Sequence, residues 1–128
     1  MNSQAINPWS WSLKLGFDQA RLIEGQRRQL VCSGQDAVDA DGNPQHPDDM
    51  AAQLRLAIDN LEAVLAEADM TLANVVRLNA YTTDVDDLFK NWTTVTDRVE
   101  GGFATSVLEV TRLGAPPLLV LLEATAVD

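Results

Sequence analysis

The sequence has one cysteine and one histidine. Each scarcity excludes a feature: the first an internal disulfide, the second a site built from several histidines. The only cysteine, Cys32, cannot form a disulfide within the chain, so stability must come from a hydrophobic core. The only histidine, His46, stands beside a proline in a polar stretch, so neither a histidine-rich metal site nor a Ser-His-Asp triad is expected. We therefore expect no metal and no cofactor.

Basic residues and long apolar runs are scarce as well. The chain has 9 Lys and Arg residues against 19 Asp and Glu residues, a net charge of −10, so its field repels polyanions and nucleic acid is an unexpected partner. The longest apolar run, 118–122, is far shorter than the roughly 20 residues that cross a bilayer. The N-terminus has no basic segment followed by an apolar one, so we expect a cytoplasmic protein without a membrane partner.

Length and composition indicate one globular domain over 1–128. The chain has 128 residues, of which 46% are hydrophobic and 22% are charged, and no Pro-, Gly- or Ser-rich linker interrupts it. A chain of this size can bury a core of its own, whereas two halves would each be too small.

The first half predicts strands, a loop and a long helix. Residues 1–18 have weak periodicity and are expected to form an arm, while 19–24 and 28–33 are strand-like and flank a glycine suited to a tight turn, which predicts an antiparallel hairpin. A Gly-, Asp- and Pro-rich loop follows at 34–47. Next comes a helix at 48–68, capped by Asp48 or Asp49, because leucine, isoleucine and alanine recur there at spacings of three and four.

The second half predicts a strand at 75–83, a helix at 85–99 capped by Asp84, and strands at 104–110 and 118–127. Long helices between strands imply crossover connections, so both helices should cover one face of a single mixed sheet. The other face would then expose apolar residues of the last strands, and such a patch is typical of an interface that self-assembly buries. The residues expected there are Val107, Leu119, Leu121 and Val127.

Five stretches, in their order and spacing, resemble the Rid (reactive intermediate deaminase) or YjgF family, also labelled L-PSP endoribonuclease. They are Phe17-Asp18-Gln19-Ala20, Cys32-Ser33-Gly34-Gln35, the helix at 53–66, the strand at 76–84, and Leu122-Glu123-Ala124-Thr125-Ala126-Val127. The resemblance implies an α+β, chorismate-mutase-like fold that assembles as a homotrimer, with small-molecule clefts between adjacent subunits.

The chain departs from this family where its deaminating members grip a substrate carboxylate. Those members carry an arginine in a Pro-Ala-Arg-Ser type segment, and a guanidinium binds a carboxylate through two hydrogen bonds. Here the run is Phe103-Ala104-Thr105-Ser106-Val107, so Thr105 stands at the place of the arginine, and Arg112 lies too far along to replace it. Trp92 replaces an asparagine of many relatives and Phe17 replaces a tyrosine. We therefore expect a more apolar cleft that is less suited to anions.

The resemblance gives Glu123 a catalytic role, as an acid that orients water or transfers a proton. The alternative is a structural glutamate hydrogen-bonded at an interface, and the residues leave both open. The expected ligand-binding residues are Phe17, Ser33, Gly34, Trp92 and Thr105. Ser33 and Gly34 would offer backbone amides, although they also suit a plain turn, and Thr105 would donate a neutral hydrogen bond or act only as a strand former.

Three functions follow as hypotheses. The first is a deaminase, a hydrolase that acts on an imine or enamine less acidic than those derived from amino acids. The second is a non-catalytic module that binds or senses a metabolite in the same cleft. The third is RNA cleavage, as the older family label has it, and this fits poorly with the negative charge.

Overall fold

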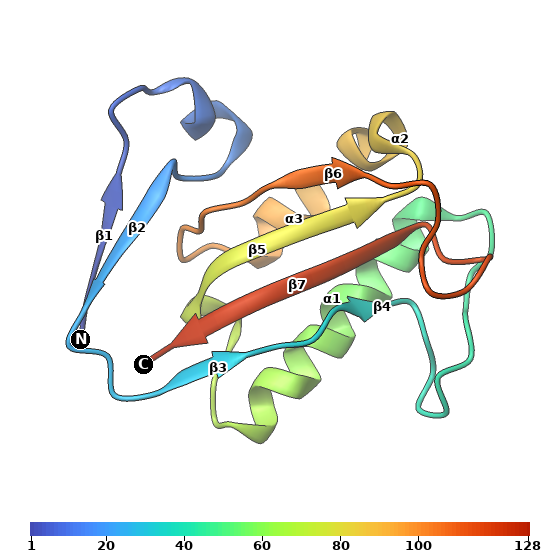
Figure 1. Cartoon of the computed structure of the whole chain (residues 1–128), viewed down its shortest axis with the longest axis horizontal. Helices are drawn as coiled ribbons and strands as arrows, with labels where there is room; N and C mark the ends of the chain where they lie inside the picture. Colours follow the sequence, from blue (N-terminus) through green and yellow to red (C-terminus); the bar gives the residue numbers. More distant parts are fainter.

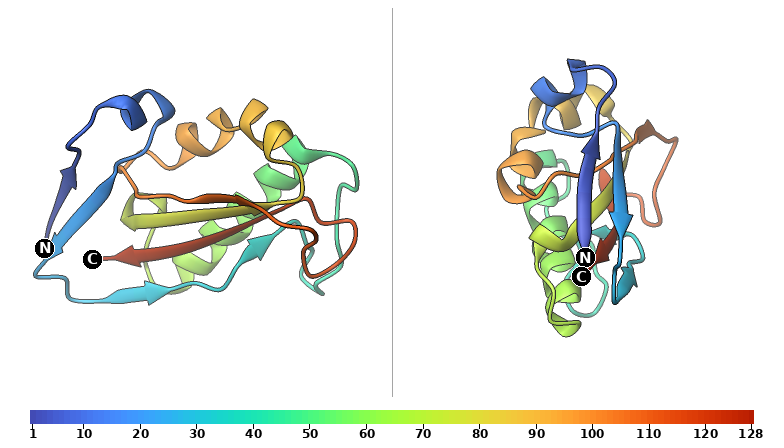
Figure 2. Two further views of the ribbon diagram at one scale, coloured as in Figure 1. Left: turned by 45° about the horizontal axis from the view of Figure 1, so that its top comes forward. Right: turned by 90° about the vertical axis from the view of Figure 1, so that its left-hand side faces the viewer.

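The computed structural model describes all 128 residues. A five-stranded sheet carries the helices on one face, and a separate two-stranded ribbon stands across one end of it (Figures 1 and 2). The ribbon is β1 (Asn2–Ile6) and β2 (Ala20–Glu24), and the main sheet is β3 (Gln29–Val31), β4 (Gln35–Asp36), β5 (Val75–Thr82), β6 (Val107–Glu109) and β7 (Val120–Val127). The helices are α1 (Met50–Glu67), α2 (Val85–Lys90) and α3 (Thr93–Arg98), with short 3-10 helices η1 (Trp11–Leu15) and η2 (Leu72–Asn74).

The main sheet is mixed, as predicted. Its strand order is β3-β7-β5-β6, with β4 also pairing with β7, and only β5 and β6 run parallel. Helix α1 confirms the prediction for 48–68: Asp49 accepts a hydrogen bond from the Ala52 amide at 3.0 Å at its start, and its apolar stripe is buried against β7. The sheet and the stripe of α1 together form the core.

The predicted helix at 85–99 is wrong as a single helix, because it divides into α2 and α3. Asn91 ends α2: its amide donates to Leu88 O, and its side chain donates to Asp87 O, both at 2.9 Å. The segment that follows is rich in β-branched residues, which extend a helix poorly. Leu88 and Val95 are nevertheless both buried, as the apolar pattern predicted.

The predicted hairpin between 19–24 and 28–33 is also wrong, and with it the single sheet. Both strands exist, but β2 pairs only with β1, while β3 pairs with β7. The short connection between them does not close a turn, because the amides of Arg27 and Arg28 both donate to Asp128 O, at 2.6 and 3.3 Å. These bonds hold the connection at the end of β7.

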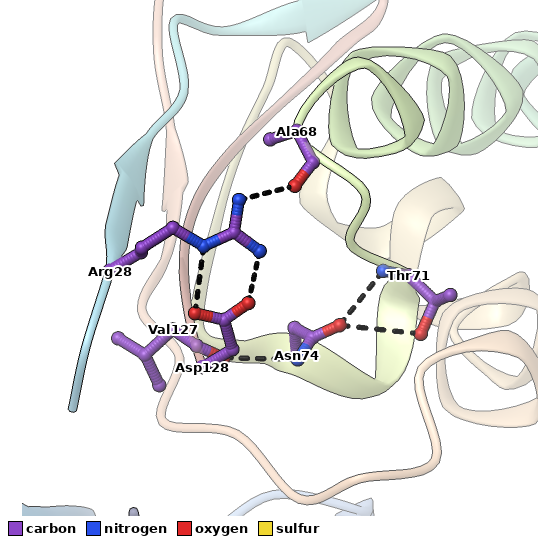
Figure 3. Close-up of polar contacts among 6 residues, drawn as sticks. All are labelled: Arg28, Ala68, Thr71, Asn74, Val127 and Asp128. Atoms are coloured by element: carbon purple, nitrogen blue, oxygen red, sulfur yellow. Dashed lines mark hydrogen bonds and ion pairs between the residues drawn. The ribbon is translucent and has the colours of Figure 1, made fainter. Parts of the chain in front are cut away.

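Arg28 and Asp128 anchor the end of β7 to the rest of the fold (Figure 3). The guanidinium binds the carboxylate through two hydrogen bonds, one of them from Nε to Oδ1 at 3.0 Å, and also donates to Ala68 O at 2.9 Å, just beyond α1. Asn74 adds a hydrogen bond from its side-chain amide to Val127 O at 3.0 Å. Hydrogen bonding from Arg28 holds the pKa of Asp128 below its usual value.

This ion pair predicts acid-sensitive stability. A carboxyl whose pKa is lower in the folded than in the unfolded state stabilises the fold above its unfolded pKa of about 4, and that contribution is lost as the pH falls through the folded pKa. We expect Asp128→Asn to lower the melting temperature at neutral pH, by an amount that shrinks as the pH drops below about 4. Asp97→Asn, at an exposed position in α3, is the matched control, and an equal effect of both variants would contradict the account.

The open face of the sheet does not expose the apolar residues that were predicted for it, with one exception. Val127 is only 2% exposed, Leu119 packs against the core, and Val107 pairs with Ala80 and therefore points to the helix side. Of the four expected residues, only the half-buried Leu121 contributes apolar surface to this face. Side chains of β5 and β7 make the middle of this face mainly polar; they are Arg77, Asn79, Tyr81, Glu123 and Thr125. Its two edges carry exposed apolar side chains, Val31, which pairs with Thr125, and Leu108, which pairs with Tyr81.

Candidate functional site

The largest cavity, of about 500 Å³, lies between the N-terminal segment, helices α2 and α3, and the start of β6. Six of its seven lining residues are hydrophobic. The lining consists of Trp11, Leu15, Phe17, Phe89, Trp92, Thr105 and Val107. Three of the predicted ligand residues, Phe17, Trp92 and Thr105, thus meet in one hollow although they are far apart in the sequence.

The tip of the ribbon closes one side of this cavity. The Asp18 amide donates to Phe103 O at 2.9 Å, and the Trp92 indole donates to Leu15 O at 3.1 Å, so the tip is held against both the segment before β6 and the start of α3. The rings of Trp11 and Phe17 pack edge to face, with centroids 5.8 Å apart. The cavity wall is therefore built from aromatic rings.

The cavity offers little to a carboxylate. None of its lining residues is charged. The hydroxyl of Thr105 donates to Leu78 O and the indole of Trp92 to Leu15 O, so the remaining polar hydrogen on a lining side chain is that of the neutral Trp11. An anion placed here would lose its hydration without gaining an ion pair, which is costly.

No arginine of the chain lines the cavity beside Thr105. Arg112 lies beyond β6 and lines a different cavity, of about 400 Å³, with Leu113, Gly114 and Pro116. Arg21 is bound to Asp18 at 2.9 Å and to the Ser3 hydroxyl at 2.7 Å, and it does not line the apolar cavity. The cavity around Thr105 therefore contains no arginine of this chain.

Glu123 belongs to a polar group on the open face of the sheet. Its Oε1 accepts hydrogen bonds from the Tyr81 hydroxyl at 3.0 Å and from the Asn79 side chain at 3.4 Å, while Asn79 Oδ1 accepts from the Ser106 amide at 3.1 Å. The hydrogen bond to Glu123 raises the pKa of Tyr81, because it favours the protonated phenol.

Ser33 and Gly34 lie in the connection between β3 and β4, beside Glu123 on β7. The Cys32 amide donates to Ala124 O at 3.0 Å, which places the exposed Ser33 next to Glu123 across the ladder. A side chain at Gly34 would meet the methyl groups of Leu121 at 2.5 Å, so glycine allows this close approach. Cys32 itself is buried, and burial raises the pKa of its thiol, which makes it a poor nucleophile.

The predicted site residues therefore form two groups on opposite faces of the sheet. Asn79 and Ala80 are neighbours on β5 and point to opposite sides; Asn79 pairs with Glu123, and Ala80 pairs with Val107 in the cavity wall. Within one chain, Glu123 does not face the apolar cavity.

Several residues of both groups were not predicted from the sequence. In the cavity these are Trp11, Leu15, Phe89 and Val107, and beside Glu123 they are Asn79 and Tyr81. The alternation of β5 was a usable signal for Asn79 and Tyr81, but only the strand pairing shows that they meet Glu123. No cluster of three or more His, Cys, Asp or Glu side chains could hold a metal ion. None of the helices is long and apolar enough to span a bilayer.

Comparison with known proteins places this fold and site among relatives. A crystal structure of YyfB from Yersinia pestis, described as a protein of unknown function of the conserved Rid family, is 34% identical, with a TM-score of 0.89 over 100% of both chains. The two chains therefore share their overall fold.

Two curated relatives match over shorter stretches. The mitochondrial protein mmf2 of Schizosaccharomyces pombe is 45% identical over 58 residues, which are 45% of this chain and 44% of the relative. The RutC family protein YjgH of Escherichia coli is 36% identical over 70 residues, which are 55% of this chain and 52% of the relative. The chain spans about half the length of these relatives.

The family model described as endoribonuclease L-PSP matches residues 17–128, which include the strands and helices around both groups of site residues. This match and the full-length likeness to a solved Rid protein agree with the resemblance found in the sequence. The chain belongs to the endoribonuclease L-PSP family, the group that also carries the names Rid and YjgF.

Proposed function

We propose that this chain is a small-molecule protein whose cavity takes an uncharged imine, enamine or carbonyl compound, and that it hydrolyses imines less acidic than those derived from amino acids. The observation that carries the proposal is the cavity around Thr105, which is apolar, large enough for a small metabolite and without any cation. Neutral ligands enter such a hollow without the desolvation cost of a carboxylate.

The proposed assembly is a homotrimer in which the two groups of residues meet across a subunit boundary. The support is twofold: the family resemblance implies clefts between subunits, and one chain presents its cavity and Glu123 on opposite faces of the sheet. Contact between the cavity side of one copy and the open face of another would bring a carboxylate to an apolar pocket.

In the proposed reaction, water adds to the imine carbon and the resulting carbinolamine expels ammonia to leave a carbonyl compound. Glu123 takes one proton from the attacking water and gives it to the imine nitrogen, which forms the carbinolamine. It then takes the hydroxyl proton of the carbinolamine and gives it to the departing nitrogen, so that ammonia leaves and the carboxylate is regenerated. The Tyr81 hydroxyl, 3.0 Å from Glu123 Oε1, holds the carboxylate in one orientation.

The direct test is to measure ammonia release from imines generated in the presence of the protein, comparing neutral imines with those of amino acids. We expect acceleration for neutral imines only, and we expect Glu123→Gln to lower the rate by about 10²-fold or more. Glu67→Gln, at an exposed position at the end of α1, is the matched control and should leave the rate unchanged. Efficient turnover of carboxylate-bearing imines by the wild type would refute the proposal.

The second candidate is a binding or sensing module, and one observation favours it: the cavity wall contains no acid or base. This candidate predicts saturable binding of neutral carbonyl compounds without ammonia release from any imine. RNA cleavage is a weaker third candidate, because the net charge is −10. Any true phosphate contact would make RNA binding weaken steeply with salt, so a flat salt titration would dismiss it.

A further inference from the structure

The main sheet and the ribbon each have a strand with one unpaired edge, β3 in the sheet and β2 in the ribbon. We infer that β2 of one copy pairs with the outer edge of β3 of a second copy, so that each main sheet is extended by a ribbon from its neighbour. The inference rests on the assembly part of the proposed function and adds the contact that would build it.

The outer edge of β3 has free hydrogen-bonding groups. Arg28 and Asp128 exchange backbone hydrogen bonds at 3.3 and 3.1 Å, and the Cys32 amide donates to Ala124 O at 3.0 Å, so Arg28 and Cys32 point toward β7. The alternation of an antiparallel ladder then turns the backbone groups of Gln29 and Val31 outward. The side chain of Val31 is 73% exposed, and an apolar edge of this kind invites pairing with another chain.

The ribbon lacks the support that a two-stranded sheet needs. β2 pairs only with β1, and an isolated pair of strands is marginal in water. Its Leu22 is 46% exposed, and Figures 1 and 2 show the ribbon standing across the end of the main sheet instead of lying along β3. A third strand would complete it.

The two edges cannot readily meet within one chain. The tip of the ribbon is held at the other side of the sheet by the bond from Asp18 to Phe103, and the connection to β3 is held by the bonds of Arg27 and Arg28 to Asp128. The open edge of β3 is therefore left for a strand from elsewhere.

A second copy fits this edge better than an unrelated partner, because the chain itself contains the matching strand. In an antiparallel pairing with Glu24 opposite Gln29, Leu22 falls opposite Val31, so two of the exposed apolar side chains of the chain would cover each other. Each copy gives one edge and receives another, which is a head-to-tail contact that closes into a ring when the rotation allows.

The test uses two chains that each have one cysteine. Both carry Cys32→Ala; one has Leu22→Cys, the other Val31→Cys, and they bear different tags and are co-expressed and oxidised. We expect a disulfide between unlike chains that links roughly half of all chains, because random mixing in a head-to-tail ring places the two cysteines together at about one contact in four. In the control the second cysteine is moved to exposed Leu108 on β6, at the opposite edge of the sheet, and the cross-link should be lost.

A second variant tests the same edge without cysteine chemistry. Val31→Pro removes only an outward amide, so circular dichroism should remain native while the mass by light scattering falls to that of a monomer. Val31→Thr keeps the amide and should keep the assembly. A trimer mass without the cross-link would overturn the strand contact but leave the proposed assembly. A monomeric wild type would overturn both. A chain with both Leu22→Cys and Val31→Cys that forms its disulfide within one chain would show an ordinary hairpin and overturn the exchange.

Discussion

Replacing Gln53 by leucine is expected to destabilise the fold by about 3 kcal/mol or more. Gln53 lies in α1 with no exposed surface. Its side-chain amide donates to His46 O at 3.1 Å and to Pro117 O at 2.8 Å, and its carbonyl accepts from the Leu119 amide at 2.8 Å. Leucine would leave these three backbone groups without a partner, and each buried unsatisfied group costs about 1–3 kcal/mol.

Urea unfolding measures this effect, and the same substitution at an exposed site supplies the control. Gln26→Leu, in the connection between β2 and β3, should change the free energy of unfolding by no more than about 0.5 kcal/mol. If Gln53→Leu were as stable as the Gln26 variant, then Gln53 would not be what joins α1 to the loop before β7.

The second large effect is expected from Thr105→Arg. A guanidinium at this position would enter a cavity without any other charge and could bind a carboxylate through two hydrogen bonds. Hydrogen bonds to charged groups contribute about 1.5–3 kcal/mol, so we expect the variant to bind α-ketoisovalerate roughly 10- to 100-fold more tightly than the wild type, as measured by calorimetry.

The control for this variant is Thr105→Val. Both substitutions remove the hydroxyl that donates to Leu78 O and should share the small loss of stability that this causes, but valine adds no charge. Equal affinity of the two variants for the keto acid would mean that residue 105 does not face the ligand.

The sequence predicted those parts of the fold that depend on local pattern. The stripe of α1 and its Asp49 cap are set by residues three or four apart, so the helix could be placed before any tertiary contact was known. The predicted hairpin was wrong because its connection depends on residues that are distant in the sequence. Its strands were correct, but hydrogen bonds from Arg27 and Arg28 to Asp128, at the far end of the sequence, decide where the connection goes.

The same division applies to the site. The resemblance located Phe17, Trp92 and Thr105, and the structure brings these three together around one cavity. Alternation with Leu121 and Thr125 along the last strand also placed Glu123 on the open face, which the strand pairing confirms. The sequence did not predict that Thr105 and Val107 face the other side, since this depends on which residues of β6 pair with β5. For β6, alternation within the strand gives two faces but does not say which of them carries the helices.

The central claim is that this cavity prefers a neutral ligand to a carboxylate, and the wild type can be tested directly. Trp11 and Trp92 line the cavity, so ligand binding should change the tryptophan fluorescence. Methyl isopropyl ketone and α-ketoisovalerate form a matched pair, because a methyl group in the first replaces the carboxylate of the second. We predict a saturable fluorescence change with the ketone and none with the keto acid over the same concentration range. Tighter binding of the keto acid would contradict the account.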